Sequence, residues 1–188
     1  RPQKNNSLID VASGTGDIAH LFLKKTDFKG TVNCVEPNMD MLKIGEAKLK
    51  NYHNIKWRQA FAEKLPFNDN TFDFYTISYG IRNVSNITQS LKEALRVLKP
   101  GGRFMCLEFS KIENQIINNI YEKYSKAIPM IGKYIVGSSH PYEYLIGSIE
   151  EFYNQDELLN LIKKSGFSDV KFRNLSNGIS AIHSGWKI

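Results

Sequence analysis

The chain has 188 residues, of which 41% are hydrophobic and 23% charged, and its net charge at pH 7 is +6. This length and apolar content predict one ordinary domain with a full core, and nothing in the composition requires a second domain. The longest apolar stretch outside the predicted strands, residues 128–137, is too short to cross a bilayer, so neither a transmembrane helix nor a signal peptide is expected.

Strands and helices alternate along most of the chain, which predicts a mostly parallel sheet covered by helices on both faces. The predicted strands are 7–12, 31–36, 55–60, 72–78, 103–109, 169–174 and 179–186. The predicted helices are 16–25, 39–51, 87–97 and 155–165, and the third should end at Pro100 with a glycine turn into the next strand. Asn177 and Gly178 predict a hairpin, so the last strand should run antiparallel to its predecessor. These features predict a Rossmann-like α/β fold.

Cys34 and Cys106 lie in apolar, strand-like runs, where a buried thiol acts as a small hydrophobe. Without nearby histidines, two cysteines predict a reducing compartment and no metal site. The lysines lie on the predicted polar helix faces, so a solvated surface is the preferred interpretation of the charge. A basic surface would also suit an anionic membrane or a nucleic acid.

The most informative stretch lies where the first strand meets the first helix. Gly14 and Gly16, followed by Ala19, fit the Gly-x-Gly-x-x-Gly/Ala spacing of a dinucleotide site. Glu36 lies where the ribose-binding acid is expected. Asp17, however, places a carboxylate where a pyrophosphate would sit, and at an effective dielectric near 20 two like charges about 4 Å apart repel by about 4 kcal/mol. The loop therefore favours S-adenosylmethionine (SAM), which carries an ammonium and a sulfonium but no phosphate, over NAD.

A set of short motifs covers nearly the whole chain in order. It comprises Ala62-Glu63-Lys64-Leu65-Pro66-Phe67, Asp69-Asn70-Thr71-Phe72-Asp73, Ile77-Ser78-Tyr79-Gly80-Ile81-Arg82-Asn83-Val84, Leu107-Glu108-Phe109-Ser110-Lys111, Ile131-Gly132, Tyr142-Glu143-Tyr144-Leu145 and His183-Ser184-Gly185-Trp186-Lys187. The chain thereby resembles the ubiquinone/menaquinone biosynthesis C-methyltransferase family, within the class I SAM-dependent methyltransferases. This resemblance implies a seven-stranded sheet with an antiparallel last strand. Because the first strand begins so early, we also expect that the sequence starts inside a longer natural chain.

The resemblance also implies the cofactor site. It assigns the methionine part of SAM to the glycine loop, the ribose hydroxyls to Glu36, the adenine to the residues after the third strand, and pocket closure to the end of the fourth. The implied SAM-binding residues are Gly14, Thr15, Gly16, Asp17, Glu36, Phe61, Ala62 and Ser78. For any one of them a purely structural role is a competing interpretation. The family usually has glycine at Ser13 and asparagine at Phe61, so Ser13 is expected to strain the loop if its φ is positive.

An aromatic carbon accepts a methyl group readily only when its ring is electron-rich, as in a deprotonated quinol. Free phenols have pKa values of about 10, so a base or cation should assist. Arg82 is the first candidate to bind the phenolate oxygen or orient a water, with a structural salt bridge as an equal alternative. Asn83 would orient the ring oxygens, and Glu108 is a possible base for which a structural role is preferred. No metal is needed.

Residues 113–153 do not fit the alternation and are predicted to be an acceptor-binding insertion. A helical apolar stripe formed by Ile116, Ile117, Ile120, Tyr121 and Tyr124 is assigned to core packing. A further group of aromatic residues would suit a polyprenyl tail: Tyr134, Tyr142, Tyr144, Phe152 and Tyr153.

The expected partners are a polyprenyl quinol, a membrane surface in peripheral contact, and a second copy or a quinone-biosynthesis complex, but no nucleic acid. The expected location is the bacterial cytoplasm at the inner membrane face, or alternatively the mitochondrial matrix. Two other functions stay open. One is methylation of another small molecule or of nucleic acid, although Ser78-Tyr79-Gly80-Ile81 replaces the Asn/Asp-Pro-Pro-aromatic motif of base amino-methylation. The other is a non-catalytic or NAD-binding module.

Overall fold

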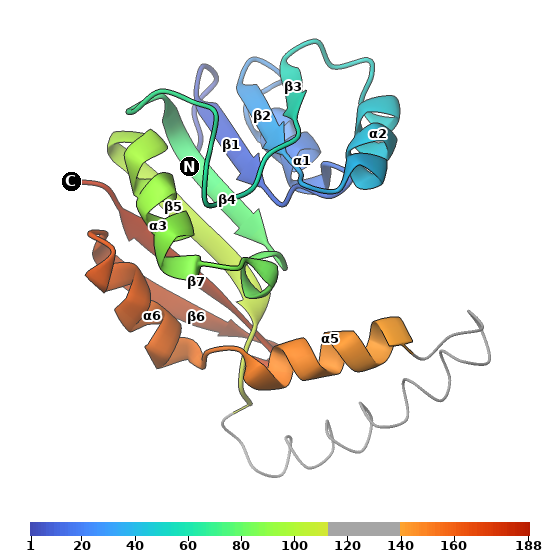
Figure 1. Ribbon diagram of the computed structural model, residues 1–188. Helices are drawn as coiled ribbons and strands as arrows, with labels where there is room; N and C mark the ends of the chain where they lie inside the picture. The colour runs from blue at the N-terminus through green and yellow to red at the C-terminus, as the bar shows by residue number, and fades with distance from the viewer. Residues whose placement is uncertain (113–139) are drawn as a thin grey trace.

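The structure is a computed structural model that describes residues 1–112 and 140–188, with side chains from residue 144 in the second range. Within these residues the strands form one seven-stranded sheet of order β3-β2-β1-β4-β5-β7-β6 (Figure 1). The strands are β1 (Ser7–Val11), β2 (Thr31–Val35), β3 (Ile55–Arg58), β4 (Phe72–Ser78), β5 (Leu98–Phe109), β6 (Ser168–Leu175) and β7 (Ser180–Trp186). β7 pairs antiparallel with both β5 and β6, while β1 to β5 pair in parallel. The predicted fold class and the antiparallel last strand are confirmed.

Five α-helices accompany the sheet in the described residues: α1 (Asp17–Lys25), α2 (Met39–Lys48), α3 (Ile87–Val97), α5 (His140–Glu151) and α6 (Gln155–Lys164). Three of them start at an asparagine whose side chain accepts backbone N–H groups of the first turn, namely Asn38, Asn86 and Asn154. α5 falls inside the predicted insertion, whereas the stripe from Ile116 to Tyr124 and Tyr134 lie outside the described residues.

Three strands end one or two residues before their predicted limits, and β5 begins five residues before its own. β1 stops at Val11 because Ala12 takes a left-handed conformation with φ of +51°. β5 starts at Leu98 because the predicted glycine turn is built into the strand as an irregularity: Phe72 pairs with Leu98, but Phe74 pairs with Arg103. Gly101, with φ of +77°, donates its N–H to the Lys187 carbonyl at 2.7 Å.

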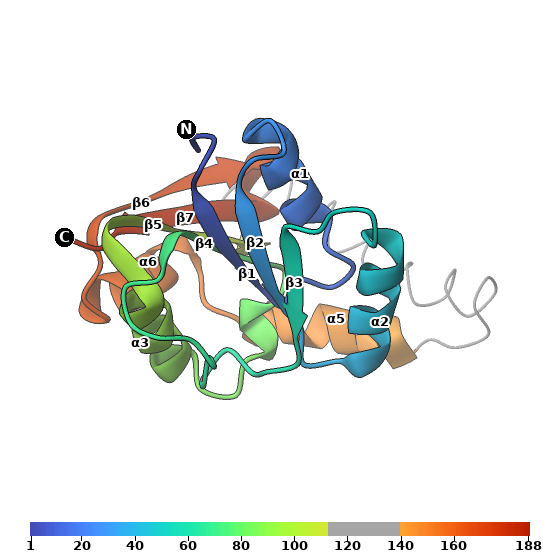
Figure 2. The ribbon, with the colours of Figure 1, turned by 90° about the horizontal axis from the view of Figure 1, so that it is seen from above.

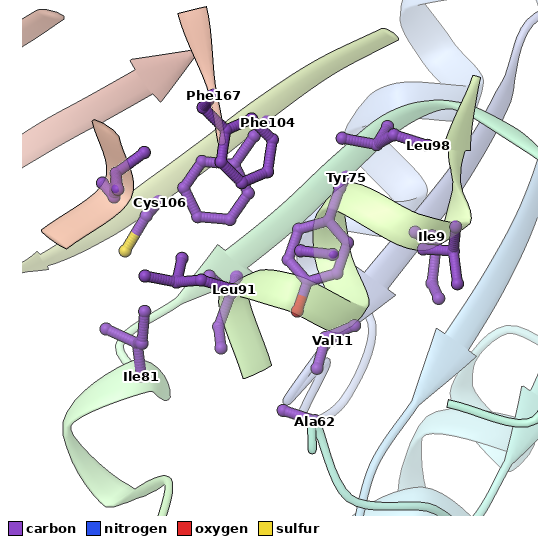
Figure 3. Close-up of a cluster of buried hydrophobic side chains, with 14 of the residues drawn as sticks. Ile9, Val11, Ala62, Tyr75, Ile81, Leu91, Leu98, Phe104, Cys106 and Phe167 are labelled. Carbon is purple, nitrogen blue, oxygen red and sulfur yellow. The ribbon is translucent and has the colours of Figure 1, made fainter. Parts of the chain in front are cut away.

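Alternation along the strands sends neighbouring side chains to opposite faces, and this creates two cores. Figure 3 shows Tyr75, Phe104 and Phe167 gathered beside Leu91 on the face that α3 and α6 cover. On the opposite face Leu8 packs with the buried side of α1. Figure 2 shows α3 and α6 on one side of the sheet and α1 on the other. The predicted three-layer arrangement is therefore present.

The hairpin between β6 and β7 has the predicted residues but a wider loop. Leu175 pairs with Ser180, so residues 176–179 connect the strands, and Asn177 has φ of +56° inside a short 3-10 turn, η2 (Ser176–Gly178). Cys34 and Cys106 are both buried and free. Across the described residues, no helix combines the length and the hydropathy that a membrane crossing requires.

Gly45 allows α2 to lie against Trp57. A Cβ atom at Gly45 would come within 2.7 Å of Trp57 Cζ3, so Gly45→Ala is expected to lower the free energy of unfolding by about 1–3 kcal/mol, despite alanine's higher helix propensity. Chemical denaturation measures this change. The matched control is Gly147→Ala in α5, where the new Cβ meets no atom of the described residues within 4 Å and stability should stay level or rise. Equal stability of Gly45→Ala and the parent would contradict the packing argument.

Candidate active site

The glycine loop, residues 12–16, leaves β1 and enters α1 with three residues at positive φ. These are Ala12 at +51°, Gly14 at +55° and Gly16 at +81°. Ser13 has no positive φ, and its N–H donates to the Val35 carbonyl at 3.1 Å. The strain expected at Ser13 is therefore absent there, and Ala12 is the non-glycine residue of the loop that carries it.

Glu36 ties this loop to the end of β2. Its Oε2 accepts the Gly14 N–H at 2.8 Å, and its Oε1 accepts the Asn38 N–H at 3.0 Å, just before α2. The side chain is nearly buried, yet it lines a pocket. Each carboxylate oxygen has two lone pairs, so Glu36 can still accept hydrogen bonds from a ligand.

Two adjoining pockets lie at the carboxyl ends of β1, β2 and β4. The first, about 390 Å³ and here called the Glu36 pocket, is lined among others by Gly14, Glu36, Met41, Phe61, Ala62, Ser78 and Asn83. The second, about 290 Å³ and called the Asp10 pocket, is lined by Asp10, Ala12, Ser13, Gly14, Thr15, Asp17, Ile18, Met41 and Ser78. They share Ala12, Gly14, Met41 and Ser78, so they form one continuous cleft. Of the eight predicted cofactor residues, seven line it.

The exception is Gly16, which lines neither pocket. A Cβ atom there would lie 2.7 Å from Leu49 Cδ1 and 3.0 Å from Trp57 Cη2. Gly16 therefore lets the loop pass closely over Leu49 at the end of α2 and Trp57 of β3, and its predicted contact with SAM stays a prediction. Phe61, in contrast, lines the Glu36 pocket with 67% of its surface exposed.

Asp10 is a site residue that the sequence analysis did not single out. It is 1% exposed next to the carboxyl end of β1, and its Oδ1 accepts the Thr76 hydroxyl at 2.6 Å. Its Oδ2 has no hydrogen-bond partner in the described part of the chain. Burial raises the pKa of Asp10 to about 7, with the Thr76 hydrogen bond acting in the opposite direction. The available signal was a carboxylate inside the apolar run Leu8-Ile9-Asp10-Val11.

Asp17 is largely exposed and paired. Lys48 Nζ, from the last residue of α2, lies 2.7 Å from Asp17 Oδ1, and the Thr15 hydroxyl donates to Asp17 Oδ2 at 3.1 Å. The hydrogen bond from Lys48 lowers the pKa of Asp17. Asp17 thus remains ionised beside the pocket, as expected, but a cation of the chain already accompanies it.

Arg82 and Glu108 form a buried ion pair, with Arg82 Nη1 at 2.7 Å from Glu108 Oε1 and side-chain exposures of 8% and 1%. The same Nη1 donates to the Tyr79 carbonyl at 2.7 Å, and Nε donates to Ser148 Oγ in α5 at 3.3 Å. Burial raises the pKa of Glu108, and the charge of Arg82 opposes that shift. Neither residue lines the Glu36 or Asp10 pocket. The ion pair links β5, Tyr79 and α5, and it is a salt bridge of the kind named as the alternative role for Arg82.

Of the three predicted catalytic residues, Asn83 alone lines the Glu36 pocket. It belongs to the short 3-10 helix η1 (Ile81–Asn83), and its Oδ1 accepts the Tyr144 hydroxyl at 3.2 Å. Tyr79, which also lines the pocket, has φ of +53°, and its ring packs against Phe109 at 4.7 Å. Strained backbone is typical of functional sites.

A third pocket of about 430 Å³, the Tyr144 pocket, lies between η1, α3 and α5. It is lined by Arg82, Ile87, Tyr144, Gly147, Ser148, Glu151, Phe152 and Tyr153. Figure 1 shows α5 below the carboxyl ends of β4 and β5. Three of the aromatic residues predicted for an acceptor tail are thus on this pocket. In the described residues, no cluster of three or more His, Cys, Asp or Glu side chains suits a metal ion.

Residues 1–187 match the ubiE/COQ5 methyltransferase family. The "Ubiquinone/menaquinone biosynthesis C-methyltransferase UbiE" of Rickettsia akari is 48% identical over 194 aligned positions, covering 100% of this chain and 78% of that protein. The protein of the same name from Brucella abortus is 47% identical, covering 96% and 68%. A SAM-dependent methyltransferase from Aquifex aeolicus has the same fold, with a TM-score of 0.71 at 20% identity, covering 97% of this chain and 82% of that one. The glycine loop closed by Glu36 and this match over nearly every residue agree: the chain is a SAM-dependent methyltransferase that belongs to the ubiE/COQ5 methyltransferase family.

Proposed function

We propose that this chain methylates a ring carbon of a polyprenylated benzoquinol or demethylmenaquinol in ubiquinone or menaquinone biosynthesis. The observation that carries the proposal is the family match over residues 1–187, together with relatives near 47% identity that bear this activity in their names. The cleft supports it, because Glu36, Asp10 and the strained Tyr79 converge at the carboxyl ends of three neighbouring strands.

The residues of the two adjoining pockets fit SAM. The unpartnered Oδ2 of Asp10 suits the ligand's ammonium group, since it is a buried acceptor aimed at no group of the described chain. Glu36, oriented by two backbone N–H groups, would accept the ribose hydroxyls, and Phe61 and Ala62 would flank the adenine. When bound, SAM supplies a methyl group on a sulfonium, which is displaced in line by the attacking ring carbon.

The acceptor side is formed by Asn83, Tyr79 and α5. Asn83 faces the Glu36 pocket and is held by Tyr144, so its amide can orient a ring oxygen. The Arg82 guanidinium donates hydrogen bonds to the Tyr79 carbonyl, Glu108 and Ser148. These bonds fix the positions of Tyr79 and α5 relative to β5. We therefore assign Arg82 and Glu108 a positioning role. Alignment and water exclusion would supply most of the rate.

Exposed apolar side chains lie on the cleft and on the neighbouring Tyr144 pocket. Phe61 is 67% and Tyr144 61% exposed, and Met41 lines both adjoining pockets. A quinol with a polyprenyl tail resides in a membrane, so such a surface suits peripheral contact with the inner membrane, with the tail directed toward the Tyr144 pocket. We propose that the protein binds peripherally to the inner membrane and acts there.

Mass spectrometry tests the proposed reaction. With SAM and a chemically reduced, demethylated ubiquinol or menaquinol precursor, we expect a product heavier by one methylene unit, with the new methyl on a ring carbon. Anionic liposomes that carry the acceptor should increase the rate. Failure to methylate either quinol, combined with methylation of an RNA or of a phenol without a tail, would overturn the proposed substrate.

Asp10→Asn tests the ammonium contact. Because burial raises the pKa of Asp10 to about 7, SAM affinity of the parent should rise between about pH 6 and pH 7.5 as the carboxylate ionises. Asp10→Asn should bind SAM at least about tenfold more weakly and lose this pH dependence, because the ligand ammonium loses its ion pair with a carboxylate and the amide does not titrate. Isothermal titration calorimetry measures both. A pH dependence that survives in Asp10→Asn would assign it to another group.

The same substitution should stabilise the ligand-free protein. Unfolded Asp10 ionises near pH 3.8, whereas folded Asp10 keeps its proton until about pH 7. Because the pKa of Asp10 is higher in the folded than in the unfolded protein, the free energy of unfolding of the parent falls as the pH rises between these two pKa values. The advantage of Asp10→Asn should therefore grow from about pH 4 to pH 7, by at most about 1.4 kcal/mol per pH unit, and then stay constant. Thermal unfolding without ligand provides the control for folding.

Arg82→Ala should keep SAM affinity, because Arg82 does not line the cofactor cleft, while losing most turnover with quinol. It should also lose about 3–5 kcal/mol of stability, since Glu108 is left buried and unpaired. Arg82→Ala combined with Glu108→Gln should recover part of that stability but little turnover. Comparison of kcat with SAM affinity separates the two effects, and an unchanged kcat would remove Arg82 from the reaction.

A further inference from the structure

All the charged residues that line the cofactor cleft in the described chain are carboxylates. Glu36 and Glu63 line the Glu36 pocket, and Asp10 and Asp17 line the Asp10 pocket. Among the lining residues of these two pockets in the described chain there is no lysine or arginine. This charge suits an ammonium and a sulfonium. The methionine end of SAM, however, also carries an α-carboxylate, which needs a cation or a strong donor beside these acids.

Lys48 is the cation attached to this wall. Its Nζ donates to Asp17 Oδ1 at 2.7 Å and to Thr15 Oγ1 at 3.3 Å, and both partners line the Asp10 pocket. An ammonium group has three N–H donors, and the contacts in the described residues use two of them. The Lys48 side chain is 43% exposed, so it can adjust toward a ligand while keeping its anchor.

The pairing also changes the role of Asp17. The charge of Asp17 is engaged by Lys48, whereas Asp10 is buried with one carboxylate oxygen that has no partner among the described residues. The two acids therefore have different roles. Asp10 can accept a hydrogen bond from the SAM ammonium, and Asp17 together with Thr15 holds the Lys48 ammonium beside the Asp10 pocket. The α-carbon of SAM carries both an ammonium and a carboxylate. The ammonium would lie against the carboxylate of Asp10, and the carboxylate would lie against the ammonium of Lys48.

We infer that Lys48 binds the α-carboxylate of SAM and that Asp17 and Thr15 are positioning residues for it. The inference concerns the methyl donor alone and holds for any acceptor. It therefore goes beyond the proposed function, and it can be tested by binding even if no quinol is methylated.

The test compares SAM with decarboxylated SAM, which keeps the ammonium and the sulfonium but lacks the carboxylate. Dissociation constants for both are measured by calorimetry on the whole chain and on Lys48→Met, Lys48→Arg, Asp17→Asn and Lys43→Met. Lys43 lies on the same helix, is exposed, and serves as the matched control for a change of net charge. Thermal unfolding confirms that each variant is folded.

Lys48→Met should weaken SAM about tenfold or more while decarboxylated SAM binds as well as to the parent or better. Lys48→Arg should retain part of the preference for SAM, and Asp17→Asn should lower it, because Lys48 loses its anchor. Lys43→Met should leave the preference unchanged. Equal weakening of both ligands by Lys48→Met, tighter binding of both, or an equal loss in Lys43→Met would overturn the inference.

Discussion

The position of β1 between β2 and β4 is the constraint on which the site depends. The chain adds β2 and β3 on one side of β1 and then crosses to the other side for β4 and β5. At this reversal, the connections leaving β1 and β4 run to opposite faces of the sheet, so a crevice opens beyond their carboxyl ends. The glycine loop, Glu36 and Ser78 meet there because β1, β2 and β4 end at the same edge of the sheet. The arrangement of the strands brings them together, and the sequence around each residue does not.

Within that crevice the carboxylates differ through burial and partners. Glu36 is oriented by backbone N–H groups of the glycine loop and of the turn before α2, Asp10 is held by one hydroxyl in the sheet, and Asp17 is solvated and paired with Lys48. The same chemical group can therefore serve as a ribose acceptor, an ammonium partner and an anchor. A buried acid with a raised pKa also costs stability, which is typical of a site where binding is favoured over folding.

On the acceptor side, one ion pair connects elements from distant parts of the chain. Arg82 joins the end of β4 to Glu108 of β5 and to Ser148 of α5, and it also holds the strained turn at Tyr79. Through Asn83 and Tyr144 the same region borders the cofactor cleft and the neighbouring aromatic pocket. A movement of α5 would therefore shift Tyr79 and Asn83, which lie where the cofactor and the acceptor would meet.

The sequence by itself determined the fold class, the strand order along the chain, the glycine loop and Glu36, since these follow from periodicity, turn residues and a fixed motif spacing. Seven of the eight residues that the family resemblance assigns to SAM line the cleft. Only the tertiary structure decided the remaining points. Gly16 packs against Leu49 and Trp57, Arg82 is paired with Glu108, and Asp17 is paired with Lys48. Each partner lies at least 26 residues away in the chain, and Asp10 acquires its raised pKa from burial between strands, so no local pattern could reveal these interactions.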